Sequence, residues 1–172
     1  MAAGLRHAWR FRADGRSLDF TDRVLGGQAP RAVDDFVVRR SDGIHAYQLA
    51  VVVDDAAMRI TEVVRGNDLL SSTPRQLLLY RALDLPAPHF AHVPLWLGED
   101  GRRLSKRHAG TSLRELREAG ARPESLLGRI AARLGLRPDE RPCSPSDLVS
   151  GFSLQGARLA PRIACGPGHS WR

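Results

Sequence analysis

ITEVVRGNDLLSSTPRQLLLYRALDLPAPHFAHVPLWLG, residues 60–98, predicts a strand, a helix and a second strand in that order. The β-branched run at residues 60–66 predicts the first strand, and AHVPLWLG at residues 91–98 predicts the second. A strand, a crossover helix and a further strand are the elements of a parallel α/β sheet. Ligands bind beyond the carboxyl ends of the strands in such sheets, and Arg65 and Gly66 end the first strand.

The helix between the two strands has start and stop signals of its own. Ser72 or Thr73 can cap its first turn, and Pro74 suits that turn because no N–H donor is needed there. Gln76 stands where a capping box has its second member. The helix is predicted to run to about Leu83, with a proline just beyond its end.

Four segments precede this stretch. AWRFRADGRSLDF at residues 8–20 predicts a β-hairpin, because apolar and polar residues alternate around an Asp-Gly turn signal. LGGQAP at residues 25–30 predicts a loop, and DFVVRRSDG at residues 35–43 predicts a strand that ends in a turn. AYQLAVVVDD at residues 46–55 predicts a strand buried on both faces. Its two terminal aspartates would then point to opposite faces, which makes them a poor pair for one site.

The last third of the chain predicts short helices. Ser112 and Glu115 have the spacing of a capping box, and Gly120 marks the end of that helix. Pro123 opens a second helix that ends at Gly135, and SPSDLVSGF predicts a third. One face of the second helix is apolar, at Leu126, Leu127, Ile130, Ala131 and Leu134. Strands with a crossover helix, followed by small helices, predict an α/β fold with an α-helical appendage.

Bulk properties narrow the class of protein. The 172 residues are 42% hydrophobic, which allows one core, or one core and a small appendage. No apolar run approaches about 18 residues, so no membrane span is expected, and the first residues lack the apolar segment of a signal peptide. Cys143 and Cys165 match no zinc pattern, and none of the histidines His45, His89, His92 and His108 has metal-ligand spacing. We therefore expect a cytoplasmic protein without a metal site.

The charge of the chain favours an anionic partner. The net charge is +7, which suits a phosphate backbone, although an arginine-rich solvated surface with no partner would give the same count. Aromatic residues make up only 6%, which argues against stacking on single-stranded bases. Lys106 is the only lysine among the 26 basic residues. Lysine is a compact point charge, so this position is either an ordinary turn residue or a contact to a phosphate in a narrow space.

Three segments together closely resemble the class I glutamyl-tRNA synthetase family. They are DGIHAYQLAVVVDDAAMRITEVVRGNDLLSSTPRQLLLYRAL (42–83), AHVPLWLGEDGRRLSKRHAGTS (91–112) and LRELREAGARPESLLGRIAARLGL (113–136). The resemblance covers roughly residues 9–155 and the C-terminal half of the family's catalytic core. The glutamyl-Q tRNA(Asp) synthetase branch, which lacks an anticodon-binding domain, is the most similar, because only 64 residues follow His108 (172 − 108).

The resemblance implies an ATP site in the loop that follows the last strand. RLSKR, residues 103–107, is similar to the family's KMSKS motif, with Lys106 on its second lysine. In the family this lysine stabilises the charge that develops as pyrophosphate leaves, so Lys106 is the implied catalytic residue and Ser105 and Lys106 the implied ATP-binding residues. Arg103 and Arg107 depart from the motif but keep or add positive charge.

The resemblance also implies two glutamate-binding residues. Tyr47 matches the tyrosine that contacts the bound glutamate, and Arg65 matches the arginine that pairs with a substrate carboxylate. Without the resemblance, Tyr47 would be a half-buried strand aromatic, and Arg65 would form a surface ion pair with Asp68 or Glu62. Gln48 stands where many full-length glutamyl enzymes have histidine, which favours the glutamyl-Q branch.

No residues match the family's HIGH-type motif or its zinc cysteines, which belong to the first half of the catalytic core. The resemblance therefore implies a truncated gene product, a split enzyme with a second chain that supplies the N-terminal half, or a remnant. It divides the chain into a hairpin and connection (1–35), the second half of a Rossmann-type catalytic domain with the KMSKS-like loop (36–110), a helical segment like those that contact the tRNA stem (111–155) and a poorly ordered tail (156–172).

The implied activity is ATP-dependent activation of L-glutamate and its transfer to tRNA. ATP enters with magnesium as a substrate, and the acceptor in the glutamyl-Q branch is queuosine of tRNA(Asp). Two alternatives stay open. The chain is a fragment of an ordinary glutamyl-tRNA synthetase, or it is a half-domain that binds tRNA or a partner chain without chemistry of its own.

Overall fold

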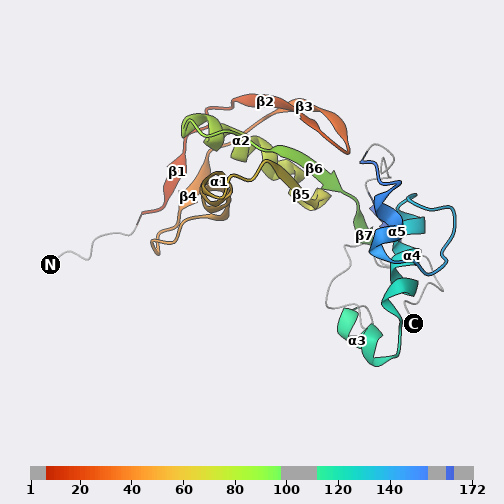
Figure 1. Cartoon of the computed structure of the whole chain (residues 1–172). Coiled ribbons are helices and arrows are strands. Elements are labelled where there is room, and N and C mark those ends of the chain that lie inside the picture. The colour runs from red at the N-terminus through yellow and green to blue at the C-terminus, as the bar shows by residue number, and fades with distance from the viewer. Residues whose placement is uncertain (1–6, 98–111, 155–161, 165–172) are drawn as a thin grey trace. The chain divides into compact units, whose positions relative to one another are not determined.

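The structure is a computed structural model that describes residues 7–97, 112–154 and 162–164 (Figure 1). The chain forms two compact units, Met1–His92 and Val93–Arg172. Each unit has its own elements and its own packing, and we describe them in turn. The KMSKS-like loop, with the predicted residues Ser105 and Lys106, lies outside the described residues.

A four-stranded sheet organises the first unit, with the strand order β3-β2-β6-β5. Its strands are β2 (Ser17–Asp22), β3 (Gly26–Ala32), β5 (Glu62–Gly66) and β6 (His89–Val93). β2 and β3 are antiparallel, whereas β2 is parallel to β6, with Asp22 opposite Phe90. The sheet is thus mixed, and residues from the start of the unit pair with residues near its end.

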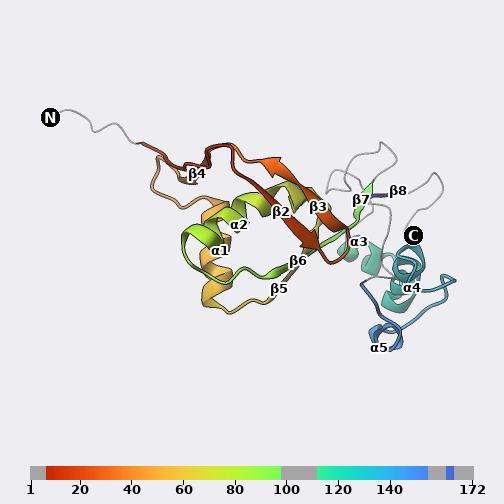
Figure 2. The same ribbon diagram turned by 90° about the horizontal axis from the view of Figure 1, so that it is seen from above.

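Two α-helices and one 3-10 turn complete the layers of this unit. They are α1 (Tyr47–Ala57), η1 (Asn67–Ser72) and α2 (Thr73–Ala82). β2 packs against α2, as Figure 2 shows from above. Val52 of α1, Leu78 of α2 and Phe90 of β6 are buried in one apolar cluster, so the core lies between the helices and the sheet. The predicted α/β class is confirmed.

The predicted strand at residues 46–55 is wrong, because this segment is the helix α1. Val52 is fully buried, and Leu49 and Ala56 pack against the same core at spacings of three and four residues. This spacing places all three side chains on one helical face. The helix penalty of three consecutive valines is only a few tenths of a kcal/mol each, roughly, which tertiary packing outweighs. The two terminal aspartates therefore lie in the last turns of a helix and not at the end of a strand.

The predicted hairpin at residues 8–20 is also wrong in its pairing. The Asp14-Gly15 turn forms, with φ of 52° and 65° and with Arg16 N–H donating to the Ala13 carbonyl at 3.0 Å. However, β1 (Trp9–Phe11) pairs antiparallel with β4 (Phe36–Arg39), and β2 pairs with β3. Local turn chemistry cannot reveal this choice, because β1 is held by distant contacts such as the tilted Phe11 and Phe36 rings, 5.3 Å apart.

The segment at residues 25–30, predicted as a loop, belongs mostly to β3. Its strand begins at Gly26, which has a φ of 77° and follows the turn after β2. The Asp22 carboxylate accepts the backbone N–H groups of Val24 and Leu25 and so closes this turn. Glycine, alanine and proline give the segment little strand propensity, so pairing with β2 determines its conformation.

The remaining predictions for the first unit are largely confirmed. β4, β5 and α2 form where the sequence predicts them, and β6 is followed by β7 (Leu95–Leu97) because Pro94 interrupts the predicted strand. The predicted capping box with Gln76 is absent, and Ser72, the N-cap residue of α2, makes no side-chain cap hydrogen bond. Gln76 is buried instead, and its Nε2 donates to Gln48 Oε1 at 2.9 Å.

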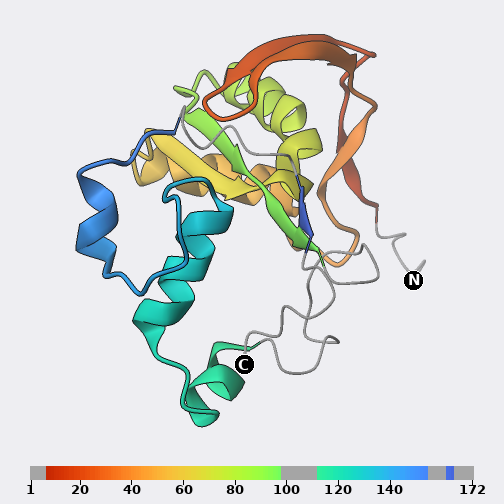
Figure 3. The same ribbon diagram turned by 90° about the vertical axis from the view of Figure 1, so that its right-hand side faces the viewer.

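The second unit contains the three predicted helices, α3 (Leu113–Glu118), α4 (Pro123–Arg133) and α5 (Pro145–Val149), and a parallel pair formed by β7 and β8 (Arg162–Ala164). The capping box of Ser112 and Glu115 is present. After α4 the chain folds back along the helix, and Cys143 N–H donates to the Glu124 carbonyl at 3.1 Å (Figure 3). Across the described parts of the chain, no helix has the length and apolar character needed to cross a membrane.

Candidate functional site: a carboxylate-binding arginine

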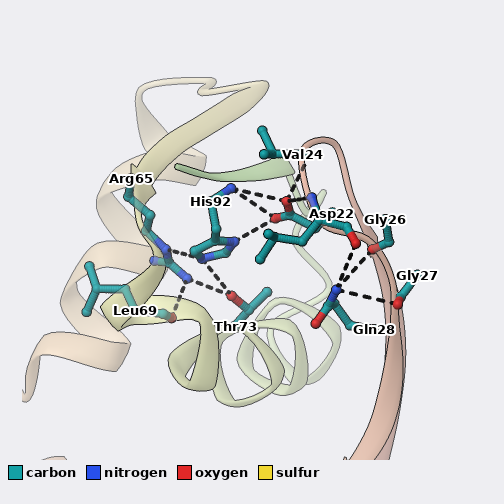
Figure 4. Close-up of polar contacts among 10 residues, drawn as sticks. Asp22, Val24, Gly26, Gly27, Gln28, Arg65, Leu69, Thr73 and His92 are labelled. Atoms are coloured by element: carbon teal, nitrogen blue, oxygen red, sulfur yellow. Dashed lines mark hydrogen bonds and ion pairs between the residues drawn. The ribbon is translucent and has the colours of Figure 1, made fainter. Parts of the chain in front are cut away.

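The candidate site lies at the carboxyl end of β5, where Arg65 is held by three hydrogen bonds (Figure 4). Its Nε–H donates to His92 Nε2 at 3.0 Å. Its Nη2 donates to Thr73 Oγ1 at 2.8 Å and to the Leu69 carbonyl oxygen at 3.4 Å. These contacts involve Nε and Nη2, so one edge of the planar guanidinium is fixed against β6, η1 and the start of α2.

Tyr47, the first residue of α1, lies beside this guanidinium. Its phenol is close enough to oppose the lowering of the Arg65 pKa, and its side chain is 51% exposed, so the phenol is not part of the core. The two residues that the resemblance assigns to glutamate are therefore brought together from separate elements. The alternative of a strand aromatic is wrong for Tyr47, which begins the helix α1 with about half of its side chain exposed. Glu62, one of the acids considered as an ion-pair partner of Arg65, instead lies 3.0 Å from Arg23.

The charge on Arg65 is retained despite its partial burial. Burial lowers the pKa of Arg65, and the Tyr47 side chain, Asp55 and Tyr80 oppose that shift. A guanidinium is in any case protonated at neutral pH. Arg65 also lies over the Phe90 ring, with 5.1 Å between its central carbon and the ring centroid. In this cation–π contact the Phe90 ring packs against the guanidinium.

Behind Arg65 lies a fully buried pair, Asp22 and His92. Asp22 is 1% exposed and His92 is 0% exposed, and Asp22 Oδ2 lies 2.6 Å from His92 Nδ1. The same carboxylate accepts the backbone N–H of His92 at 3.1 Å. Because Arg65 donates to Nε2, that nitrogen must be unprotonated, and the proton of a neutral His92 must lie on Nδ1, where it is donated to Asp22.

The pKa values of the pair agree with this assignment. Burial lowers the pKa of His92, although Asp22 acts in the opposite direction. Burial alone would raise the pKa of Asp22, but the backbone N–H of Leu25, the His92 side chain and two further N–H donors outweigh it, so the pKa is lowered. A carboxylate anion next to a neutral imidazole is the state that these directions favour.

Other polar contacts hold α1 against α2 near the site. Gln48 Nε2 donates to Ser72 Oγ at 3.0 Å, and Gln48 Oε1 accepts from the buried Gln76. Gln48 follows Tyr47 in the chain, so these bonds also fix the start of α1. Asp55 is a further neighbour of the arginine: burial raises the pKa of Asp55, and Arg65 opposes the shift. Burial and Asp55 together raise the pKa of Tyr80 to about 12.

This arrangement is suited to binding a carboxylate and not to proton transfer. A charged, planar fork with one fixed edge can meet a carboxylate with strong, directional hydrogen bonds. The neighbouring phenol offers a donor and exposed ring area. Among the residues that the structure describes, no group of three or more His, Cys, Asp or Glu side chains could hold a metal ion.

The resemblance predicts Tyr47 and Arg65 as binding residues, but it does not indicate that Asp22 and His92 lie behind Arg65. His92 lies in the apolar stretch HFAHVPLWL, and a histidine among buried residues is a signal that it has a specific partner. The identity of that partner was not accessible, because Asp22 is 70 residues away.

An α/β unit with an ordered arginine at a strand end could serve an enzyme that binds a carboxylate substrate, and the comparisons define the family. The model of the class I tRNA synthetases (E and Q), catalytic domain, matches residues 1–147. The chain therefore belongs to the class I tRNA synthetases of the glutamate and glutamine type.

Several relatives are similar over most of this chain. A glutamyl-Q tRNA(Asp) synthetase of Symbiobacterium thermophilum is 50% identical over 155 residues, which cover 89% of this chain and 48% of the relative. A glutamate–tRNA ligase of Geotalea uraniireducens is 44% identical, and the match covers 33% of the length of that relative. The crystal structure of a glutamate tRNA ligase from Elizabethkingia meningosepticum, in complex with its amino acid, matches with a TM-score of 0.70 and 27% identity over 87% of this chain and 34% of that one. The chain thus spans a third to a half of the length of these relatives.

Proposed function

We propose that this chain contributes the second half of the catalytic core of an ATP-dependent glutamate–tRNA ligase. The observation that carries the proposal is the guanidinium of Arg65, held at its inner edge and placed beside the exposed phenol of Tyr47. Arg65 pairs with a carboxylate of L-glutamate, and Tyr47 contacts the same amino acid. The similarity to tRNA synthetases and the net charge of +7 support a nucleic-acid substrate.

In the proposed reaction a carboxylate oxygen of glutamate attacks the α-phosphorus of ATP, which enters with magnesium. The bond from that phosphorus to the bridging oxygen breaks, and pyrophosphate leaves. Lys106 stabilises the charge that develops on the leaving group, and Ser105 contacts ATP. The glutamyl group then passes to tRNA with release of AMP. We expect the protein to act in the cytoplasm, where its tRNA substrate would be available.

Queuosine of tRNA(Asp) is the proposed acceptor. The similarity to several glutamyl-Q tRNA(Asp) synthetases at 48–50% identity supports this acceptor. An ordinary glutamyl enzyme would charge tRNA(Glu) instead. Transfer of labelled glutamate to queuosine-containing tRNA(Asp), compared with tRNA(Glu), distinguishes the two. Labelling of tRNA(Glu) alone would contradict the proposed acceptor but not the ligase activity.

The activation step is tested by glutamate-dependent ATP–pyrophosphate exchange. We expect exchange from the purified chain, either by itself or with a second chain that supplies the first half of the core, and its loss in Lys106→Ala. The matched control is Arg114→Ala, which removes a charge from the exposed surface of α3. Salt-dependent tRNA binding, without exchange under either condition, would contradict the ligase and support a half-domain that only binds tRNA.

A further inference from the structure

The orientation of the Arg65 guanidinium depends on which of its nitrogens are hydrogen-bonded. Arginine side chains have several rotatable bonds, so holding one in a single orientation costs rotamer entropy. Thr73 Oγ1 and the Leu69 carbonyl accept from Nη2 only. The contact from Nε to His92 holds a second nitrogen of the same planar group, so the guanidinium plane is fixed in direction and not held at one end alone.

His92 can accept from Arg65 only as one tautomer. Its Nε2 must be unprotonated, so its proton must lie on Nδ1. Asp22 enforces this, because a buried carboxylate 2.6 Å from Nδ1 needs a donor there. Asp22 is itself immobilised by the backbone N–H groups of Val24, Leu25 and His92. The chain of contacts runs from the β2–β3 turn through β6 to the guanidinium on β5, as Figure 4 shows.

We propose that His92 is a positioning residue for Arg65, and that Asp22 sets the tautomer of His92 which this role requires. The consequence is that the outer edge of the guanidinium is presented to the carboxylate of the amino-acid substrate in a fixed direction. The inference rests on the proposed function for its substrate, since glutamate is the ligand that Arg65 is expected to bind.

The matched variants His92→Gln and His92→Asn separate this role from a purely structural one. The amide oxygen of glutamine reaches the place of Nε2 and can accept from Arg65, but its contact with Asp22 is lost. The amide nitrogen of asparagine reaches the place of Nδ1 and can donate to Asp22, but the Arg65 Nε–H then loses its acceptor. If His92 has only a structural role, the asparagine variant, which keeps the Asp22 contact, should behave more like the parent chain. If His92 positions Arg65, the glutamine variant, which keeps the Arg65 contact, should do so.

Two readouts on the full chain are compared at equal folded fraction. The first needs no ligand and is the solvent exchange rate of the Arg65 Nε–H, measured by NMR. The second is the Kd for L-glutamate, measured by titration. We expect His92→Asn to lose protection of this N–H and to bind glutamate roughly 10- to 100-fold more weakly, as a misplaced binding group does. We expect His92→Gln to retain protection and to lie within about threefold of the parent Kd.

Asp22→Asn is the variant to use if neither His92 variant folds. Asparagine can donate to Nδ1, which moves the imidazole proton to Nε2 and leaves two donors facing each other at Arg65. His92 is unchanged, yet Arg65 should lose its protection, and the imidazole ¹⁵N shifts should show protonated Nε2. Retained protection in Asp22→Asn would overturn the proposal.

The outcomes separate this inference from the proposed function. Equal protection of Arg65 in the asparagine and glutamine variants, or an unprotected Nε–H in the parent chain, would overturn the positioning role. If the parent chain binds no glutamate while protection follows the expected order, the positioning of Arg65 by His92 is supported and glutamate is the wrong ligand.

Discussion

The Asp22 carboxylate lies 2.6 Å from His92 Nδ1, with both side chains buried and 70 positions apart in the chain. This contact joins the end of β2 to β6 at the point where the two strands are parallel neighbours. It also places a neutral histidine between an anion and the cation of Arg65. One buried pair therefore links the register of the sheet to the candidate substrate site.

The stability of the first unit should depend on pH through His92. Burial lowers the pKa of His92 from its ordinary value of 6.5, so the unfolded chain binds a proton at this residue before the folded chain does. The contribution of His92 to the free energy of unfolding should therefore be largest above about pH 6.5 and should fall as the pH drops toward the pKa of the folded state. Asp22, whose pKa is also lowered, should continue the fall below its ordinary value of 3.8.

Urea unfolding at a series of pH values measures this dependence. The charged groups that act on the pKa of His92 are Asp22, Arg65 and Asp68. Replacing His92 removes its titration from the pH dependence of stability. His92→Gln should flatten the slope below about pH 6.5, while replacement of the exposed His89 by glutamine should keep it. A slope that persists in His92→Gln would assign the dependence to another group.

Arg65→Lys should weaken glutamate binding although it keeps the positive charge. Lysine lacks the Nε donor that meets His92 and cannot form two parallel hydrogen bonds to a carboxylate. We expect a loss of tenfold or more in affinity, which corresponds to about 1.4 kcal/mol, measured by titration with L-glutamate. Arg23→Lys, at the surface pair with Glu62, is the control and should bind normally. Parent-like affinity in Arg65→Lys would exclude a bidentate contact.

Tyr47→Phe should affect binding without affecting folding. The variant removes the hydroxyl that contacts Arg65 but keeps the ring, which is half exposed. One hydrogen bond contributes about 0.5–1.5 kcal/mol, so we expect the affinity for glutamate to be about two- to tenfold weaker. The thermal unfolding midpoint should remain unchanged. A clear drop in that midpoint with normal affinity would show that the hydroxyl serves the fold and not the ligand.

Gly128→Ala in α4 should destabilise the second unit. Alanine normally stabilises a helix relative to glycine by about 1 kcal/mol. Here a methyl group would overlap the Arg141 carbonyl oxygen and would come within 2.8 Å of its carbonyl carbon. The chain after α4 would have to move away, at a cost of about 1–3 kcal/mol.

Chemical denaturation of the variant, followed by a probe in the second unit, tests this close approach. Trp96 belongs to that unit and lies under the Arg133 guanidinium, so its fluorescence is a suitable signal. Gly151→Ala is the matched control, because no atom lies within 4 Å of the position that its methyl group would occupy. Gly128→Ala as stable as the control would mean that the returning chain does not pack against α4.

The elements with local signals were predictable from sequence. β5 and α2 follow from a β-branched run and from the proline at the helix start, and the capping box of α3 follows from Ser112 and Glu115. In each case residues within one or two turns contain the necessary chemistry. Tyr47 and Arg65 were named from the resemblance to the family and not from such local signals, and their role in binding stays a prediction.

The errors occur where distant packing outweighs local preference. Residues 46–55 have the composition of a strand but form α1, because Val52 and its helical neighbours fill the core between the sheet and α2. β1 has a turn signal directly after it but pairs with β4, whose Phe36 packs on Phe11. Burial of apolar area is non-local, and its free energy exceeds the small differences in intrinsic propensity.

The amino-acid sequence alone determined the class of fold, the family, and the residues expected to bind glutamate and ATP. It could not indicate that Asp22 and His92 stand behind Arg65, because a hydrogen bond between residues 70 positions apart depends on strand order and not on spacing. The parallel pairing of β2 with β6 brings these residues together and removes them from water. Their protonation states, and with them the orientation of the arginine, are therefore properties of the folded chain.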